Sequence, residues 1–270
     1  MNIGLIIVGD EILSGKRRDQ HLPKVIELLA ARGMMLSWAR YVGDDRLRIT
    51  ADLQHAFGSG DLVFSCGGIG ATPDDHTRQC AAAALGAELT LHPVARDLIM
   101  ERMRDVATEQ GLPYEPDRAD NRHRLNMGVF PVGARLIPNP YNKIAGFSCG
   151  HVHFVPGFPV MAWPMIEWVL DTHYPHLHGG ASTVERSVIV FGAMEATLTP
   201  LMEEIEARFA GCKVFSLPSV DHPQYGRHIE LGVKGREDPV AAFAALRQGL
   251  QAVGVRLGPE MVRLSGSVCT

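Results

Sequence analysis

The stretch Asp61–Thr77, DLVFSCGGIGATPDDHT, decides the fold of the first half of this chain. Its apolar run Leu62–Ser65 predicts a buried parallel strand. Glycines follow at once, and an alanine-rich helix is predicted over Thr77–Leu85. A glycine-rich turn that leads from a strand into a helix leaves backbone N–H groups free to bind phosphates and other anions. The stretch therefore predicts a ligand-binding turn at the end of a strand.

Acidic side chains occur at the same turn and at a second strand end. Asp74 and Asp75 follow the glycines, and Asp10 and Glu11 follow the first predicted strand. Carboxylates attract a metal ion or an N–H donor such as the edge of a pterin or a guanine. Glycines beside paired acids therefore indicate a ligand with one anionic end and one end rich in hydrogen-bond donors.

Two other interpretations of the turn do not require a ligand that has both an anionic end and a donor-rich end. In the first, Thr72 is the N-cap of the helix, with Pro73 in the first helical position and Asp75 three residues after the cap. In the second, the turn is a dinucleotide-binding fingerprint, for which Gly68 and Gly70 fit but Pro73 occupies the place of the third glycine. Capping alone does not require the glycines, and the fingerprint is incomplete.

Composition limits the class of protein. The chain has 270 residues, a hydrophobic fraction of 46% and a formal net charge of −4, which are typical of a soluble globular protein with a large core. This charge gives no general attraction to nucleic acid or to acidic membranes. We expect neither a transmembrane helix nor a signal peptide, because no apolar run is long enough and the N-terminal segment lacks a basic leader. The five cysteines are odd in number and lack C-x-x-C pairing, so we expect reduced thiols and a cytoplasmic location.

The first part of the chain alternates predicted strands and helices. This order predicts a parallel sheet covered by helices on both faces, which binds ligands at the carboxyl ends of its strands. The strands are predicted over Ile3–Val8, Met34–Val42, Leu62–Ser65, Arg135–Ile137 and His151–Val155, and the helices over Leu22–Arg32, Ile49–Phe57, Thr77–Leu85, Ala95–Gln110 and Met165–Thr172.

The pattern changes after a predicted linker, Tyr174–Ser182. The elements beyond it have the order βαββαβ, which is typical of a small ferredoxin-like domain. We therefore expect two domains, residues 1–175 and 182–270. The strands of the second are predicted over Val184–Phe191, Lys213–Leu217, His228–Val233 and Val255–Leu257, and the helices over Thr199–Phe209 and Pro239–Val253.

Four segments in the first part resemble one known family. They are GDEILSGKRRD (Gly9–Asp19), GGIGATPDDHT (Gly67–Thr77), PVGARLIPNP (Pro131–Pro140) and VPGFP (Val155–Pro159). Together they resemble the competence/damage-inducible protein A (CinA) family. The resemblance implies a three-layer α/β/α molybdopterin-binding fold of the MoaB/Mog type with a mainly parallel sheet. It also implies a smaller α+β domain, ferredoxin-like or KH-type, after it.

The resemblance assigns the ligand pocket to these same loops. The glycine turn with Thr72 would cradle an anionic group, Asp74 and Asp75 would meet the pterin or a metal, and Asp10 and Glu11 would face them. A divalent ion (Mg, Mn or Co) would be held by Asp10, Glu11 and Asp75. The complete set of implied ligand-binding residues is Gly67, Gly68, Gly70, Thr72, Asp74, Asp75, Asp10, Glu11 and Gly157.

The resemblance leaves three functions open. The first is binding of a molybdopterin-like or related nucleotide ligand in molybdenum-cofactor metabolism. The second is a metal-dependent pyrophosphatase acting on ADP-ribose or FAD, and the third is a non-catalytic regulatory or structural relative. Met161 stands where the family often has Glu, and His21 where it often has Asn. We also expect the C-terminal amidohydrolase domain of long CinA proteins to be absent.

The partners that we expect are a small-molecule ligand and a second copy of the chain, without nucleic acid or membrane. From residue 180 onward nine Lys and Arg face ten Asp and Glu, so no basic patch is predicted. His151 and His153 share one face of a predicted strand, which we interpret as exposed. Cys66, beside the glycine turn, is interpreted as a small buried residue.

Overall fold

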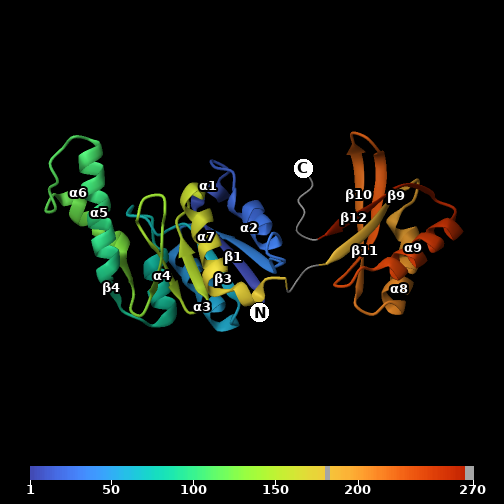
Figure 1. The fold of residues 1–270 in the computed structure, drawn as a ribbon, viewed down its shortest axis with the longest axis horizontal. Helices are drawn as coiled ribbons and strands as arrows, with labels where there is room; N and C mark the ends of the chain where they lie inside the picture. The colour runs from blue at the N-terminus through green and yellow to red at the C-terminus, as the bar shows by residue number, and fades with distance from the viewer. Residues whose placement is uncertain (180–182, 265–270) are drawn as a thin grey trace. The chain divides into compact units, whose positions relative to one another are not determined.

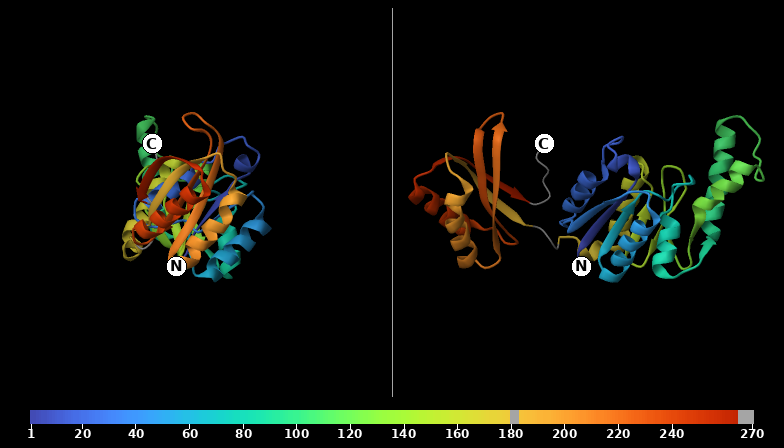
Figure 2. Two further views of the ribbon diagram at one scale, coloured as in Figure 1. Left: turned by 90° about the vertical axis from the view of Figure 1, so that its right-hand side faces the viewer. Right: turned by 180° about the vertical axis from the view of Figure 1, so that it is seen from behind.

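The computed structural model describes residues 1–179 and 183–264 of the chain. The chain divides into two compact units, drawn as ribbons in Figure 1 and Figure 2. The first unit consists of Met1–Leu28 with Met35–Leu177, and the second of Leu29–Met34 with His178–Thr270. Within the described residues no helix has the length and apolar character needed to cross a membrane.

A six-stranded sheet of order β2-β1-β3-β8-β7-β6 forms the centre of the first unit. Four neighbouring strands run parallel, and the last two, β7 and β6, pair antiparallel. The prediction of a mainly parallel sheet is confirmed. The strands are β1 (Ile3–Val8), β2 (Trp38–Val42), β3 (Leu62–Cys66), β6 (Arg135–Ile137), β7 (Gly146–Cys149) and β8 (Val152–Val155).

Helices cover both faces of this sheet. One face packs on α3 and α4, whose apolar residues Leu53 and Ala81 share a core cluster with Val63 of β3 and Phe154 of β8. The other face is covered by α2 and α7 (Figures 1 and 2). Strands buried on both faces read as continuous apolar runs, which explains why β1 and β3 show no alternation. The covering helices are α2 (His21–Ala30), α3 (Arg46–Ser59), α4 (Thr77–Leu85) and α7 (Pro159–His173).

Several short elements were not predicted. They include α1, which begins directly after β1, and a two-stranded antiparallel sheet of β4 and β5 that lies outside the main sheet. The long helix predicted over Ala95–Gln110 is present as α5 (Pro93–Glu109). The unpredicted elements are α1 (Asp10–Leu13), β4 (Leu89–Leu91), α6 (Ala119–Arg124), η1 (Leu125–Gly128), β5 (Val129–Pro131), η2 (Pro175–Leu177) and, within the main sheet, β7 (Gly146–Cys149).

Several predicted boundaries are wrong. In the second unit, the helix predicted from Thr199 begins at Glu195, and the strands predicted to end at Leu217 and Leu257 extend to His222 and Leu264. In the first unit, two boundaries are wrong. The strand predicted from Met34 begins at Trp38, because the Met34 amide donates to Leu29 O at 2.8 Å and closes the end of α2 instead. The helix predicted from Met165 begins at Pro159. A proline in the first turn of a helix has no N–H to lose, so Pro159 fits there. Pro164 lies inside α7 all the same, so prolines in this stretch do not mark the end of regular structure.

The second unit has the predicted βαββαβ order. Its antiparallel sheet has the order β10-β11-β9-β12, so β11 separates the two strands of the first βαβ element. The helices α8 and α9 pack on the sheet around a core that contains Val190, Leu231 and Leu246. The expectation of a separate ferredoxin-like α+β domain is confirmed. Its elements are β9 (Val184–Phe191), α8 (Glu195–Arg208), β10 (Cys212–His222), β11 (Gly226–Gly235), α9 (Val240–Val253) and β12 (Arg256–Leu264).

Candidate ligand-binding site

Three loops of the first unit meet at the carboxyl ends of parallel strands. The loop after β3 touches the loop after β8, since a Cβ added at Gly157 would lie 3.4 Å from the Gly67 Cα. The loop after β1 is tied to the same place by His21, whose Nε2 donates to Gly157 O at 3.0 Å. The structure therefore brings together the segments that carry the predicted site residues.

The glycine turn after β3 is required by packing. Gly67 has φ +106°, and a Cβ there would lie 2.4 Å from Val8 O. Gly68 has φ +68°, and its Cβ would lie 2.2 Å from the Thr77 Oγ1. No larger residue fits at either place without moving the end of β1 or the start of α4. Close approach of the backbone thus explains these two glycines before any ligand is considered.

Thr72 and Asp75 form a closed turn of their own. The Asp75 Oδ2 accepts hydrogen bonds from the Thr72 amide at 2.9 Å and from its hydroxyl at 2.5 Å. The Asp75 amide donates back to Thr72 O at 3.1 Å. The helix α4 begins only at Thr77, with His76 as its N-cap. The interpretation of Thr72 as the cap of this helix is therefore wrong. The turn lies between the glycines and the helix, where Gly70 leaves room for the Asp75 carboxylate.

Asp10 and Asp44 bridge the ends of β1 and β2. The Asp10 amide donates to Asp44 Oδ2 at 2.9 Å, and the Asp44 amide donates to Asp10 Oδ1 at 3.2 Å. Gly43 permits this contact, because its Cβ would lie 2.3 Å from the Asp10 Oδ1. Asp44 was not among the predicted site residues. The signal was present, since Asp44 follows the carboxyl end of a parallel strand as Asp10 and Asp74 do.

Four carboxylates share one electrostatic environment here. Burial raises the pKa of Asp44, the Asp10 amide lowers it, and the negative charges of Asp10, Asp74 and Glu11 raise it further. The side chains of Asp10, Glu11 and Asp74 are exposed. A cluster of this kind attracts cations and N–H donors. Asp75, in contrast, is engaged by Thr72.

Comparison with known proteins identifies the first unit. Residues 4–178 match the model of a family described as a probable molybdopterin binding domain. The chain belongs to this family. The match covers all the loops described above, and membership in the molybdopterin-binding domain family indicates a ligand-binding role for them at the level of the family.

Relatives of the molybdopterin-binding domain confirm the resemblance to CinA. The chain is 32% identical to a CinA-like protein of Anaeromyxobacter dehalogenans over 195 residues, which is 70% of this chain and 44% of the relative. It is 30% identical to a CinA-like protein of Geobacter metallireducens over 271 residues, 98% of this chain and 62% of the relative. The chain thus spans about half the length of the curated relatives that it matches.

A solved structure supports the fold of the molybdopterin-binding domain. The protein CinA with unknown function from Thermoplasma acidophilum is 27% identical, with a TM-score of 0.52. The similarity covers 63% of this chain and 98% of that protein. The predicted fold class is confirmed for this part of the chain.

The metal ligands predicted for the molybdopterin-binding domain are not gathered into one group. Among residues 1–179 and 183–264, no three His, Cys, Asp or Glu side chains lie where they hold a metal ion together. Asp75 faces Thr72, whereas Asp10 pairs with Asp44. Binding of a divalent ion by Asp10, Glu11 and Asp75 stays a prediction. A ligand that brings its own phosphate oxygens would have to complete the coordination.

The two histidines predicted on one strand face, His151 just before β8 and His153 within it, are arranged differently from the prediction. His151 is exposed, but His153 is fully buried, so the two rings do not share an exposed face. The Ser148 Oγ lies 2.8 Å from the His153 Nδ1, and the Tyr174 hydroxyl lies 2.9 Å from its Nε2. Burial, and then the positive charges of His173, Arg135 and His151, lower the pKa of His153 to about 3. Both ring nitrogens are occupied by hydroxyls, which is the arrangement of a neutral structural histidine.

Stability should therefore fall in mild acid. The unfolded chain takes up a proton at the ordinary pKa of 6.5, whereas folded His153 resists protonation down to about 3. Unfolding then binds a proton in this window, so the free energy of unfolding should fall by about 1.4 kcal/mol per pH unit from pH 6.5 downward. Urea denaturation between pH 7 and 4 measures this slope.

A matched pair of variants isolates the contribution of His153 to this slope. His153→Gln keeps a donor and an acceptor for the two hydroxyls and does not titrate. The free energy of unfolding of this variant should therefore depend less steeply on pH than that of the wild type. His151→Gln, at the exposed neighbour, should keep the slope. Equal slopes in the wild type and in His153→Gln would contradict the interpretation.

The described cysteines form no disulfide. Cys66, Cys80, Cys149 and Cys212 are free thiols. Cys66 is buried, and this burial raises the pKa of its thiol, which agrees with a small packing residue and not with a reactive thiolate. Cys269 lies outside the described residues.

Proposed function

We propose that the first unit binds a molybdopterin-like or related nucleotide ligand at the glycine turn and the acidic loops beside it, as part of molybdenum-cofactor metabolism. The observation that carries this proposal is the convergence of three strand-end loops around carboxylates of Asp10, Glu11, Asp44 and Asp74. Family membership supports a ligand of this class.

The chemistry of these groups fits a pterin. Its ring N–H and amino groups donate hydrogen bonds, and ionised carboxylates accept them without offering a competing donor. Asp10, Glu11 and Asp74 are exposed and available for this role. Backbone amides of the turn after β3 would receive an anionic group. We propose ligand contacts for Gly67, Gly68, Gly70, Thr72, Asp75 and Gly157 in the same turn and in the loop after β8.

Thermal unfolding in the presence of candidate ligands tests the proposal. Pterins, ADP-ribose and FAD would each be added with and without magnesium, manganese or cobalt. A ligand at 100 times its Kd stabilises the folded state by about 2.7 kcal/mol, which raises Tm by several degrees in a protein of this size. We expect this shift for a pterin. No shift with any of these compounds would favour the third possibility, a regulatory or structural relative without a ligand.

The alternative enzyme function is a metal-dependent pyrophosphatase. A metal bound by the acidic loops would bridge the phosphates of the substrate and activate water. The acidic cluster favours this alternative. However, the chain carries Met161 where an additional acid would assist the metal, and its described acids do not form a three-ligand group.

Hydrolysis of ADP-ribose or FAD should accordingly be slow or absent. The protein would be incubated with either substrate and with magnesium, manganese or cobalt, and the products separated by chromatography. Robust turnover that is lost in Asp75→Ala would show that the enzyme function is correct and the carrier function incomplete. Asp45→Ala, at an exposed acid that caps α3, is the control for general effects of the substitution.

For the second unit we propose a role in folding or assembly. We place its domain at residues 182–270 and the ligand-binding domain at 1–175, with a second copy of the chain as the expected partner and the cytoplasm as the expected location. Its basic residues are interleaved with acids, as where Arg186 is paired with Asp238. RNA or DNA binding at physiological salt would need clustered, unpaired cations.

A further inference from the structure

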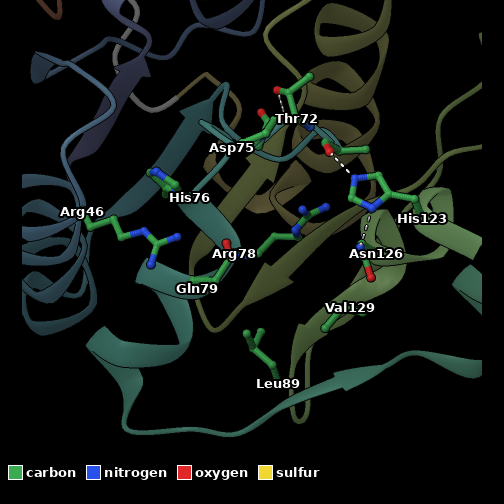
Figure 3. Close-up of a pocket in the computed structure, with 12 residues that line it drawn as sticks. Arg46, Thr72, Asp75, His76, Arg78, Gln79, Leu89, His123, Asn126 and Val129 are labelled. Carbon is green, nitrogen blue, oxygen red and sulfur yellow. Dashed lines mark hydrogen bonds between the residues drawn. The ribbon is translucent and has the colours of Figure 1, made fainter. Parts of the chain in front are cut away.

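A pocket of about 310 Å³ lies beside the Thr72–Asp75 turn, between the starts of α3 and α4 and the segment α6–η1 (Figure 3). Nitrogen donors dominate its polar lining. Arg46 is the first residue of α3, and Arg78 belongs to the first turn of α4. The polar residues that line it, apart from the turn itself, are Arg46, His76, Arg78, Gln79, His123 and Asn126.

Arg78 is a buried cation with unused donors. Its side chain is only 4% exposed, and its guanidinium donates one hydrogen bond, to Ile69 O at 2.7 Å. It forms no ion pair with any carboxylate in the part of the chain that the structure describes. Burial lowers its pKa, and the negative charge of Asp75 opposes this effect. A guanidinium carries five N–H donors, so most of those of Arg78 remain available to a ligand.

Arg46 supplies a second cation on the same pocket. Its side chain is exposed and has no ion pair within residues 1–179 and 183–264. Figure 3 draws the Arg46 guanidinium pointing toward the start of α4, beside Gln79, and the Arg78 guanidinium near His123 and Asn126. His123 closes this space from the other side, because its Nε2 donates to Ala71 O at 2.9 Å. The two arginines thus lie on the pocket together with the segment α6–η1, which the hydrogen bond of His123 connects to the residue before Thr72.

The start of α4 adds to the positive potential. Its N-cap, His76, makes no side-chain hydrogen bond to the first turn, so the positive end of the helix is not neutralised by a capping acid. Asp75 is the acid in the pocket lining, and its Oδ2 is held by Thr72. The pocket therefore presents two arginines and a helix N-terminus against one engaged carboxylate.

We propose that this pocket binds a phosphate group, either as a free phosphate or as the phosphate end of a larger ligand. A planar guanidinium matches phosphate oxygens in charge and geometry, and the unpaired charge of buried Arg78 is stabilised when an anion enters. The pocket shares Thr72 and Asp75 with the proposed ligand site, so the proposal extends that function, but its cations, Arg46 and Arg78, are not among the groups proposed to meet the pterin.

Calorimetric titration with inorganic phosphate tests the pocket directly. Arg46→Gln removes the exposed cation and should raise the Kd for phosphate about tenfold, the factor expected for one charge-assisted hydrogen bond. Arg48→Gln, the same substitution two residues further along α3 and outside the pocket, should change it less than twofold. Affinity in the wild type should also weaken as sodium chloride is raised.

Arg78→Lys examines the buried cation. It keeps the charge but loses the planar set of donors, and it should weaken phosphate binding if circular dichroism shows that the variant folds. If Arg78→Lys does not fold, the phosphate Kd of Arg46→Gln, compared with that of Arg48→Gln, is the test of the proposal. No phosphate binding at millimolar concentration, or equal Kd values for Arg46→Gln and Arg48→Gln, would overturn the proposal.

A titration with ADP-ribose separates the two sources of phosphate. If the pocket holds the phosphate end of a larger ligand, Arg46→Gln should weaken ADP-ribose and inorganic phosphate by similar factors. If it holds free phosphate, only the inorganic anion should respond. Absence of pterin binding together with an unchanged Kd for inorganic phosphate would count against the acidic loops and not against this pocket.

Discussion

Gly67→Ala is expected to lower the free energy of unfolding by about 2–4 kcal/mol and to abolish ligand binding. The added Cβ would lie 2.4 Å from Val8 O, and the residue has φ +106°. Relief of the clash requires the turn to move away from the end of β1, which also displaces the amides that would hold an anion. Chemical denaturation measures the stability, and calorimetry with the ligand found by thermal shift measures the binding.

Gly86→Ala is the matched control for the contact at Gly67. Gly86 ends α4 with φ +63°, but no atom lies within 4 Å of the position of its Cβ. Gly86→Ala should lower the free energy of unfolding only by the strain of the left-handed backbone, about 1 kcal/mol, and should leave ligand binding intact. Equal losses of stability in the two variants would mean that the approach to Val8 is not tight. Full ligand binding by folded Gly67→Ala would remove the turn from the site.

Asp75→Asn should weaken the ligand of the acidic loops about 10- to 100-fold with little change in Tm. The amide oxygen of Asn still accepts the two hydrogen bonds that Thr72 donates, so the turn is preserved. Only the negative charge is lost, and a hydrogen bond to a charged group contributes about 1.5–3 kcal/mol. Calorimetry with a pterin measures the loss, and the same substitution at Asp74 should act in the same direction.

Asp45→Asn is the control for this substitution. Asp45 also accepts a backbone hydrogen bond, from the Arg48 amide, but it serves as the N-cap of α3. Asn caps a helix as well as Asp does, so neither stability nor binding should change. Unchanged pterin binding in both Asp74→Asn and Asp75→Asn would exclude this pair from the site. A large fall in Tm would indicate that the Asp75 charge serves the turn instead.

Much of the fold was predictable from sequence because the deciding signals are local. The apolar run before Gly67 predicted β3, and the alanine-rich segment predicted α4 with its observed bounds, Thr77–Leu85. In the second unit β9 was also predicted with its observed bounds, Val184–Phe191. Strand and helix periodicity extends over a few residues, so it can be read without knowing what the segment packs against.

The arrangement of the candidate site was predictable only in part. Alternation of strands and helices predicted that the loops after Val8 and Cys66 lie at one edge of the sheet, and the structure places them there. It did not predict that Asp44 pairs with Asp10 from 34 residues away, or that Arg46 and Arg78 line one pocket. These contacts depend on which strand ends are neighbours in the sheet.

The sequence by itself determined the principal helices and strands, their order and the family of the molybdopterin-binding domain. Tertiary structure decided which side chains are buried and paired. It placed His153 in the core, closed Thr72 onto Asp75, and made Gly67 a point of contact with β1. The physical reason is that secondary structure follows backbone preferences within a few residues. Burial and hydrogen-bond partners follow from contacts between segments far apart in the chain, which no local pattern records.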